Sequence, residues 1–239
     1  MAQLILLLGN SGAGKSTSMR NLDPKDVCLI NIYKKPLPFR NKFTETIQTN
    51  DYKKIIDTLT TTKKPIIIVD DFQGLLSGEF MATIDEKGFD KYNRLAYHYF
   101  KVIDTAINLG DDKIVIFTSH IDRTDAGYEK IKTIGKLLDE KICIEGLFTV
   151  VIKSIVQDGG YYFTTKNSGT DTVKTPLDMF DADVIDNDLA YVVEKVKEYY
   201  GMDNAKTADE LSTMDKEKTV PIELPKKRTR PTLDKSCPF

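Results

Sequence analysis

A glycine-rich segment at residues 9–16 joins a short apolar run, residues 4–8, to a stretch with helical character. It begins with glycine and ends with Gly-Lys-Ser, which is the spacing G-x-x-x-x-G-K-[ST]. The apolar run is typical of a buried parallel strand, and residues 15–21 are expected to begin a helix. A chain that passes from strand to helix through such a loop is expected to adopt an α/β fold and to bind phosphate groups there.

Each residue type in this loop has a chemical reason. Glycines permit positive φ and let the backbone approach an anion without an intervening Cβ. Lys15 supplies an ammonium group for β and γ phosphates, and the Ser16 hydroxyl is expected to bind Mg²⁺. The pattern therefore predicts a nucleoside triphosphate site with Mg²⁺, in which Lys15 also acts in catalysis. The residues expected to contact the nucleotide are Gly9, Asn10, Ser11, Gly12, Ala13, Gly14, Lys15, Ser16 and Thr17.

A second apolar run, residues 66–69, ends in Asp70 and Asp71. Its β-branched residues predict a buried parallel strand whose carboxyl end lies where open α/β sheets bind ligands. In a nucleotide-binding protein this is the Walker B element. Asp70 is expected to bind Mg²⁺, and Asp71 is the candidate to orient or deprotonate the attacking water. Acids that are merely solvated at a strand end are the alternative interpretation, above all for Asp71.

Residues 113–118 predict a further strand, which is followed by Ser119 and His120. Polar groups at this edge would face the γ phosphate, so either residue is a candidate to sense or assist hydrolysis. An ordinary strand end is the alternative. The next segment is basic, and its cations could meet phosphates of DNA or of a nucleotide on a neighbouring subunit, or could be simply solvated. These candidates are Arg123, Lys130, Lys132 and Lys136.

The spacing of apolar residues predicts several further elements. They are a strand at residues 27–32, helices at 52–59, 89–109 and 187–200, and a β-hairpin formed by 147–156 and 161–165. We expect residues 1–201 to form one domain, in which helices flank a mostly parallel central sheet that the hairpin closes. Residues 202–239 are rich in charge and contain four prolines, which predicts a flexible tail.

Composition excludes several classes of protein. No apolar run is long enough to cross a membrane, and residues 1–8 lack the basic start of a signal peptide, so a cytoplasmic location is expected. Cys28, Cys143 and Cys237 are widely separated, which favours neither a zinc site nor a disulfide framework. The formal net charge of -2 argues against nucleic-acid binding over the whole surface, although a local basic groove is compatible with it.

Several motifs in combination resemble those of a known family. They are residues 9–16, the 31–39 stretch with Lys-Pro-Leu-Pro-Phe, 70–73, 86–90, 119–120 and 130–136. Over residues 1–200 the chain resembles the bacteriophage ATP-binding proteins of the RecA-related single-strand annealing family. The resemblance implies a RecA-like P-loop fold of the RecA and AAA type and a DNA-stimulated ATPase. It also implies binding of single-stranded DNA, assembly into an oligomer, and action beside a single-strand DNA-binding protein in the host cytoplasm.

One departure from bacterial recombinases concerns the hydrolytic base. In those proteins a catalytic glutamate follows the second core strand, but residues 31–34 of this chain contain no acid. Either Asp71 takes the role, or turnover is slow and ATP acts chiefly as a switch. Two other functions stay open on the sequence. One is a small-molecule nucleoside or nucleotide kinase, which the scarcity of arginine disfavours; the other is a non-hydrolysing, ATP-gated module that recruits partners.

Overall fold

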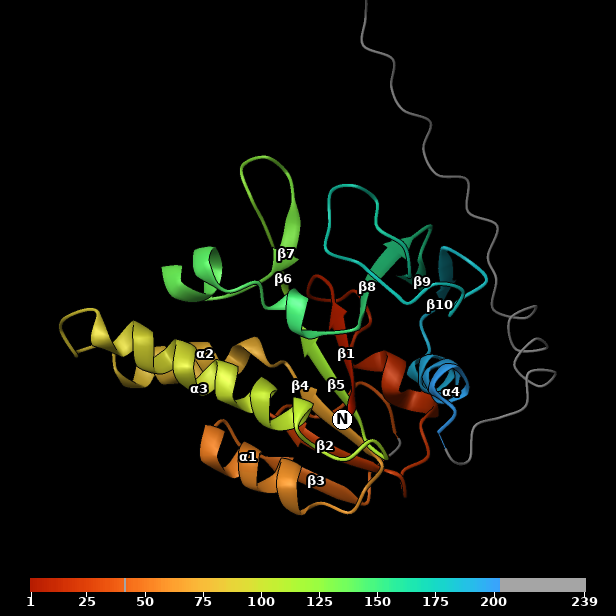
Figure 1. Ribbon diagram of the computed structural model, residues 1–239, viewed down its shortest axis with the longest axis horizontal. Helices are drawn as coiled ribbons and strands as arrows, with labels where there is room; N and C mark the ends of the chain where they lie inside the picture. Colours follow the sequence, from red (N-terminus) through yellow and green to blue (C-terminus); the bar gives the residue numbers. More distant parts are fainter. Residues whose placement is uncertain (41, 203–239) are drawn as a thin grey trace, which may run out of the picture.

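The computed structural model describes residues 1–40 and 42–202, and these form a layered α/β structure (Figure 1). The strands are β1 (Gln3–Leu8), β2 (Val27–Asn31), β3 (Glu45–Gln48), β4 (Ile66–Asp70), β5 (Ile114–Ser119), β6 (Ile121–Arg123), β7 (Glu129–Ile131), β8 (Val150–Gln157), β9 (Gly160–Thr164) and β10 (Val184–Asp186). The longer helices are α1 (Tyr52–Thr61), α2 (Gln73–Ala82), α3 (Asp90–Ile107) and α4 (Leu189–Tyr200). Short helical turns are η1 (Thr17–Asn21), η2 (Leu137–Lys141) and η3 (Glu145–Leu147).

Eight strands form one sheet in the order β10-β9-β8-β1-β5-β4-β2-β3. The strands from β8 to β3 in this order all run parallel, whereas β9 and β10 are antiparallel to their neighbours. The parallel register pairs Leu8 of β1 with Ser119 of β5, and Val69 of β4 with Phe117 of β5. The carboxyl ends of β1, β5 and β4 therefore meet at one edge of the sheet, with β5 in the middle.

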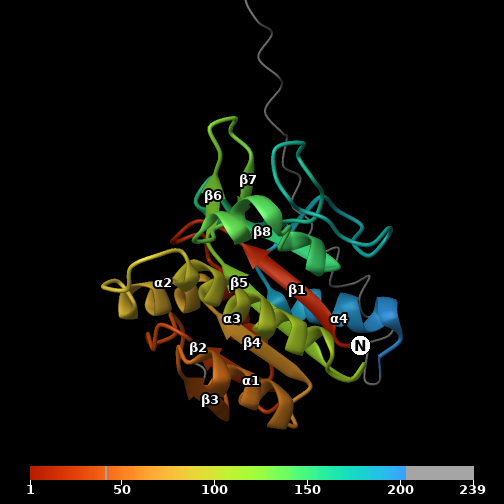
Figure 2. The same ribbon diagram turned by 60° about the vertical axis from the view of Figure 1, so that its left-hand side comes forward.

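Helices cover both faces of the sheet, because its central strands carry apolar side chains on both faces. In β1, Leu4, Leu6 and Leu8 face a core formed with α1, α2 and α3, while Ile5 and Leu7 face a second core formed with η1 and α4. The alternation follows from the two-residue period of a strand. Figure 2 shows α4 on the opposite side of the sheet from α1 and α3. The expectation of a mostly parallel sheet flanked by helices is confirmed.

The structure also contains elements that the spacing of apolar residues did not predict. They are the edge strands β3 and β10, helix α2, and the small two-stranded sheet of β6 and β7. The β8–β9 hairpin is present, but β10 extends the sheet beyond it, so the hairpin does not close the sheet. The predicted helix at residues 15–21 is shortened to the five-residue 3-10 turn η1. The short strands at the edges bury few apolar side chains, which leaves a weak sequence signal.

Three further expectations concern the predicted tail, a membrane span and the start of the helix predicted at residues 89–109. The predicted tail, residues 202–239, lies outside the described residues except for Met202. Among the described residues, none of the helices has the length and apolar character that spanning a bilayer requires. Phe89, expected as the first residue of the helix at residues 89–109, precedes α3, which begins at Asp90, and its side chain is 84% exposed.

The exposed Phe89 and the buried Phe72 provide a matched test of this core. Phe72 is fully buried, and its ring stacks on Tyr99 at 4.0 Å and meets Phe117 edge-on at 4.8 Å. We expect Phe72→Ala to lower the free energy of unfolding by about 3–5 kcal/mol because it leaves a cavity between β5 and α3. Phe89→Ala is expected to change it by less than about 0.5 kcal/mol. Denaturant unfolding of both variants measures the difference, and equal effects would contradict this packing.

Candidate functional site

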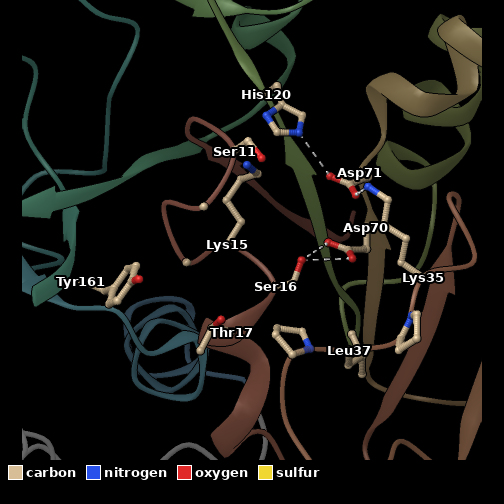
Figure 3. A pocket seen from close by; sticks show the side chains of 14 residues that line it. Ser11, Lys15, Ser16, Thr17, Lys35, Leu37, Asp70, Asp71, His120 and Tyr161 are labelled. Atoms are coloured by element: carbon tan, nitrogen blue, oxygen red, sulfur yellow. Dashed lines mark hydrogen bonds and ion pairs between the residues drawn. The ribbon is translucent and has the colours of Figure 1, made fainter. Parts of the chain in front are cut away.

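The glycine-rich loop lies between β1 and η1, at the carboxyl edge of the sheet (Figure 3). Gly12 and Gly14 have φ of +77° and +95°, a region that L side chains rarely adopt. The Lys15 ammonium is buried and donates hydrogen bonds to the carbonyl oxygens of Gly9 at 2.8 Å and Asn10 at 2.9 Å. The Ser154 hydroxyl on β8 donates to the carbonyl of the loop from behind, at Ala13. The loop is thus curled around Lys15 and anchored to the sheet.

Asp70, at the end of β4, connects the loop to β5. Its carboxylate accepts a hydrogen bond from Thr118 Oγ1 at 2.7 Å, and Ser16 Oγ lies 3.3 Å from both carboxylate oxygens. Burial, and then the negative charge of Asp71, raise the pKa of Asp70 to about 6, against the opposing effects of Thr118, Ser16 and Lys15. A cation beside this group would favour its ionised form. Carboxylate and hydroxyl oxygens are ligands that Mg²⁺ accepts, so Ser16 and Asp70 fit the predicted metal role.

Asp71 occupies a strained position next to Asp70. Its φ is +57°, in the left-handed region, and its backbone N–H donates to Thr118 Oγ1 at 2.9 Å. Its carboxylate lies 3.8 Å from the Lys35 ammonium and 3.7 Å from His120 Nε2. Aspartate tolerates this conformation better than most residues, and such backbone strain is concentrated at functional sites. Figure 3 shows the Asp71 side chain directed toward both His120 and Lys35.

His120 follows β5 and faces the same space. Burial and the positive charge of Lys15 lower the pKa of its imidazole, although Asp71 opposes this effect, so the ring is neutral at neutral pH. The backbone N–H of His120 and the Ser119 hydroxyl both donate to Gln73 Oε1, at 3.2 Å and 3.1 Å. Ser119 is fully buried in this contact. Of the two sensor candidates, only His120 therefore lines the pocket.

These residues surround a pocket of about 350 Å³. Sequence reasoning did not assign two parts of its wall: the proline-rich segment at residues 35–38, and Tyr161 of β9. Tyr161 packs so closely that a Cβ on Gly14 would lie 2.9 Å from its ring. The sequence of neither segment indicates which element it faces in the folded chain. The lining residues are Ser11, Gly12, Gly14, Lys15, Ser16, Thr17, Lys35, Pro36, Leu37, Pro38, Asp70, Asp71, His120 and Tyr161.

The four basic candidates do not line this pocket. Arg123 pairs with Glu129 across the β6–β7 hairpin, and Lys130 pairs with Asp139. Lys132 is exposed, and its backbone N–H donates to the carbonyl of His120 at 2.9 Å. Lys136 is exposed at the start of η2. Two of the four charges are therefore balanced within the chain, and the other two face solvent beside the pocket residue His120 or next to η2.

No model of a protein family matches the chain, and no curated protein does. What the pocket can bind follows from its own groups. It combines a loop whose backbone N–H groups can face an anion, a buried ammonium, a hydroxyl and two carboxylates. Phosphate oxygens suit the loop and the ammonium, while a divalent cation suits the hydroxyl and Asp70.

The raised pKa of Asp70 predicts a pH-dependent effect of Asp70→Asn on stability. From pH 4 to above 6 the folded state binds this proton more tightly than the unfolded state, whose pKa is 3.8, so the free energy of unfolding falls as pH rises. Without divalent cations, Asp70→Asn should equal the wild type near pH 4 and exceed it by roughly 2 kcal/mol at pH 8. Denaturant unfolding across this range measures the trend. A pH-independent difference, or the same trend in the exposed control Asp57→Asn, would contradict it.

The two positive-φ glycines of the loop should differ in their tolerance of alanine. A Cβ at Gly12 meets open space, so Gly12→Ala should cost only the left-handed backbone strain of about 1–2 kcal/mol. A Cβ at Gly14 would also approach Tyr161 at 2.9 Å and Asn187 Nδ2 at 3.1 Å. Gly14→Ala should therefore lower the unfolding free energy further than Gly12→Ala, as thermal or denaturant melts can measure. Equal costs would mean that Tyr161 does not press on the loop.

Proposed function

We propose that this chain is a Mg²⁺-dependent ATPase of the RecA-like P-loop type, which binds single-stranded DNA and promotes annealing or recombination as an oligomer. One observation carries the ATPase part of the proposal. Lys15, Ser16, Asp70 and Asp71 come from two distant segments, yet they converge on one pocket with His120 beside them. Phosphate, metal and water each have a candidate partner there.

Different residues of the pocket bind the phosphates, hold the metal and activate the water. The loop and Lys15 bind the phosphates, and Ser16 with Asp70 would hold Mg²⁺, which when bound draws charge from the phosphate oxygens. The Asp71 carboxylate lies 3.7 Å from His120 Nε2, and it orients a water and accepts its proton. The neutral His120 ring can donate or accept a hydrogen bond at the same place. The loop is suited to phosphates only and does not distinguish one base from another. Adenine as the base is therefore proposed on the family resemblance.

The order of the strands supports the RecA-like interpretation. The polar-tipped strand β5 lies between β1, which carries the loop, and β4, which carries Asp70. Thr118 can therefore bond both Asp70 and the Asp71 backbone, and His120 reaches the pocket. A small-molecule kinase would need an arginine-bearing lid over its acceptor. Among the described residues that line the pocket there is no arginine, which favours the ATPase over the kinase.

The position of the β6–β7 hairpin supports a link to DNA. The hairpin begins directly after His120 and projects beyond the carboxyl edge of the sheet (Figures 1 and 2). Lys132 follows β7 and is bonded through its backbone to His120. A nucleic acid strand held by the exposed cations of this region would therefore act on a pocket residue. Oligomerisation, a single-strand DNA-binding partner and the cytoplasm of a bacterial host complete the proposal, on the family resemblance alone.

Phosphate release from ATP with Mg²⁺, measured with and without single-stranded DNA, tests this function. We expect DNA to stimulate release by the wild type. Lys15→Ala should abolish nucleotide binding and release, because it removes the buried ammonium of the loop. Asp71→Asn should keep binding but slow release by about 10²-fold or more, since it removes the proton acceptor. Asp57→Asn, an exposed acid of α1, is the control that should match the wild type.

Three outcomes would contradict the proposal in different ways. Release that survives Lys15→Ala would show that the loop is not the nucleotide site. Tight ATP binding with no release, even on DNA, would favour the switch module over the ATPase. Phosphate appearing on an added nucleoside instead of in solution would favour the kinase.

A further inference from the structure

One cation in the pocket wall has no role in the mechanism above. Lys35 lies in the segment between β2 and β3, and its side chain lines the pocket beside Asp71. Its ammonium is 3.8 Å from Asp71 Oδ2 and 4.5 Å from the centre of the Tyr33 ring. Among the described residues that line the pocket, Lys15 and Lys35 are the only side chains that carry a full positive charge.

The backbone that carries Lys35 is held in place, whereas its side chain is not. The buried Asn31 side chain donates to the carbonyl oxygen of Lys35 at 2.7 Å, across a turn in which Lys34 has φ of +57°. Tyr33, under the ammonium, packs on α2, where a Cβ at Gly74 would lie 2.8 Å from its ring. The Lys35 side chain itself is 67% exposed. An ion pair this exposed is weak, so the ammonium can leave Asp71 for a more highly charged partner.

The two lysines and His120 already lie within electrostatic reach of one another. Burial has the largest effect on the pKa of Lys15 and lowers it; the charges of Asp71 and Asp70 raise it, and the charge of Lys35 lowers it with the smallest effect of the four. Lys35 also contributes to the lowered pKa of His120, after burial and Lys15. Positive charges that repel across a pocket gain stability when an anion enters between them. The space between Lys15, Lys35 and His120 is therefore suited to the most negative part of a nucleotide.

We propose that Lys35 is a γ-phosphate ligand that distinguishes ATP from ADP and controls the availability of Asp71. In the ion pair, Lys35 holds the Asp71 carboxylate. A terminal phosphate offers several charged oxygens and attracts the ammonium more strongly than one carboxylate does. The exchange frees Asp71 to orient the attacking water only when the substrate is a triphosphate. This inference rests on the proposed ATPase function, and it places the discriminating cation in the same subunit as the loop.

The test compares Lys35→Gln with Lys34→Gln, a matched change at a neighbouring lysine that does not line the pocket. Dissociation constants are measured by calorimetry for ADP and for a β,γ-imido analogue of ATP, both with Mg²⁺. Lys35→Gln should weaken analogue binding about tenfold and leave ADP binding unchanged, because only the analogue carries a γ phosphate. Lys34→Gln should leave both affinities unchanged. An unchanged ratio in Lys35→Gln, or an equal loss for ADP, would overturn the proposal.

A second variant tests the exchange itself. Asp71→Asn releases Lys35 and removes a negative charge, so it should raise the affinity for the analogue relative to ADP. The double variant Lys35→Gln with Asp71→Asn should lose most of that gain, and a gain that persists in full would overturn the exchange. Failure of the ATPase proposal is distinguishable. Wild-type protein that binds neither nucleotide overturns both proposals, whereas binding that Lys15→Ala abolishes but Lys35→Gln leaves unaltered overturns only the role of Lys35.

Discussion

The hydrogen bonds that Asp70 accepts from Thr118 and Ser16 are the interaction on which the pocket depends. They join the ends of β4 and β5 to the loop after β1, three segments far apart in the chain. A single-residue shift in the register of either strand would move these side chains to the other face of the sheet. Because β1, β4 and β5 are buried on both faces, their register is strongly determined. The positions of the pocket side chains at the ends of these strands are fixed with it.

The two carboxylates of the pocket are only partly neutralised by its two ammonium groups. Adjacent carboxylates on Asp70 and Asp71 repel each other, and burial adds to the cost of ionising Asp70. Lys15 offsets part of that cost, Lys35 pairs with Asp71, and Lys15 also satisfies two loop carbonyls. A metal ion would offset the negative charge of the carboxylates, and a phosphate would offset the positive charge of the lysines. Bringing these charged groups together costs free energy of folding. That cost is the physical reason to interpret the pocket as a ligand site and not as a group of stabilising interactions.

The β6–β7 hairpin lies next to the pocket but contributes no residue to its lining. Lys153 of β8 forms ion pairs with Glu129 of β7, at 3.0 Å, and with the buried Asp171, at 2.8 Å. These bonds attach the hairpin to the strand that also supports the loop through Ser154. The hairpin therefore has two connections to the site, one through β8 and one through His120.

Four features could be predicted from the order of residues alone, because each leaves a local pattern of residue types: the glycine-rich loop, the strand ending in Asp70 and Asp71, the polar-tipped strand before His120, and the α/β class. The edge strands β3 and β10 and the β6–β7 hairpin left no such pattern, since short strands bury few apolar side chains. Only the tertiary structure decided that Lys35 and Tyr161 complete the pocket and that Arg123 and Lys130 are paired away from it. Those contacts depend on which strands become neighbours, and strand order is a property of the whole buried core.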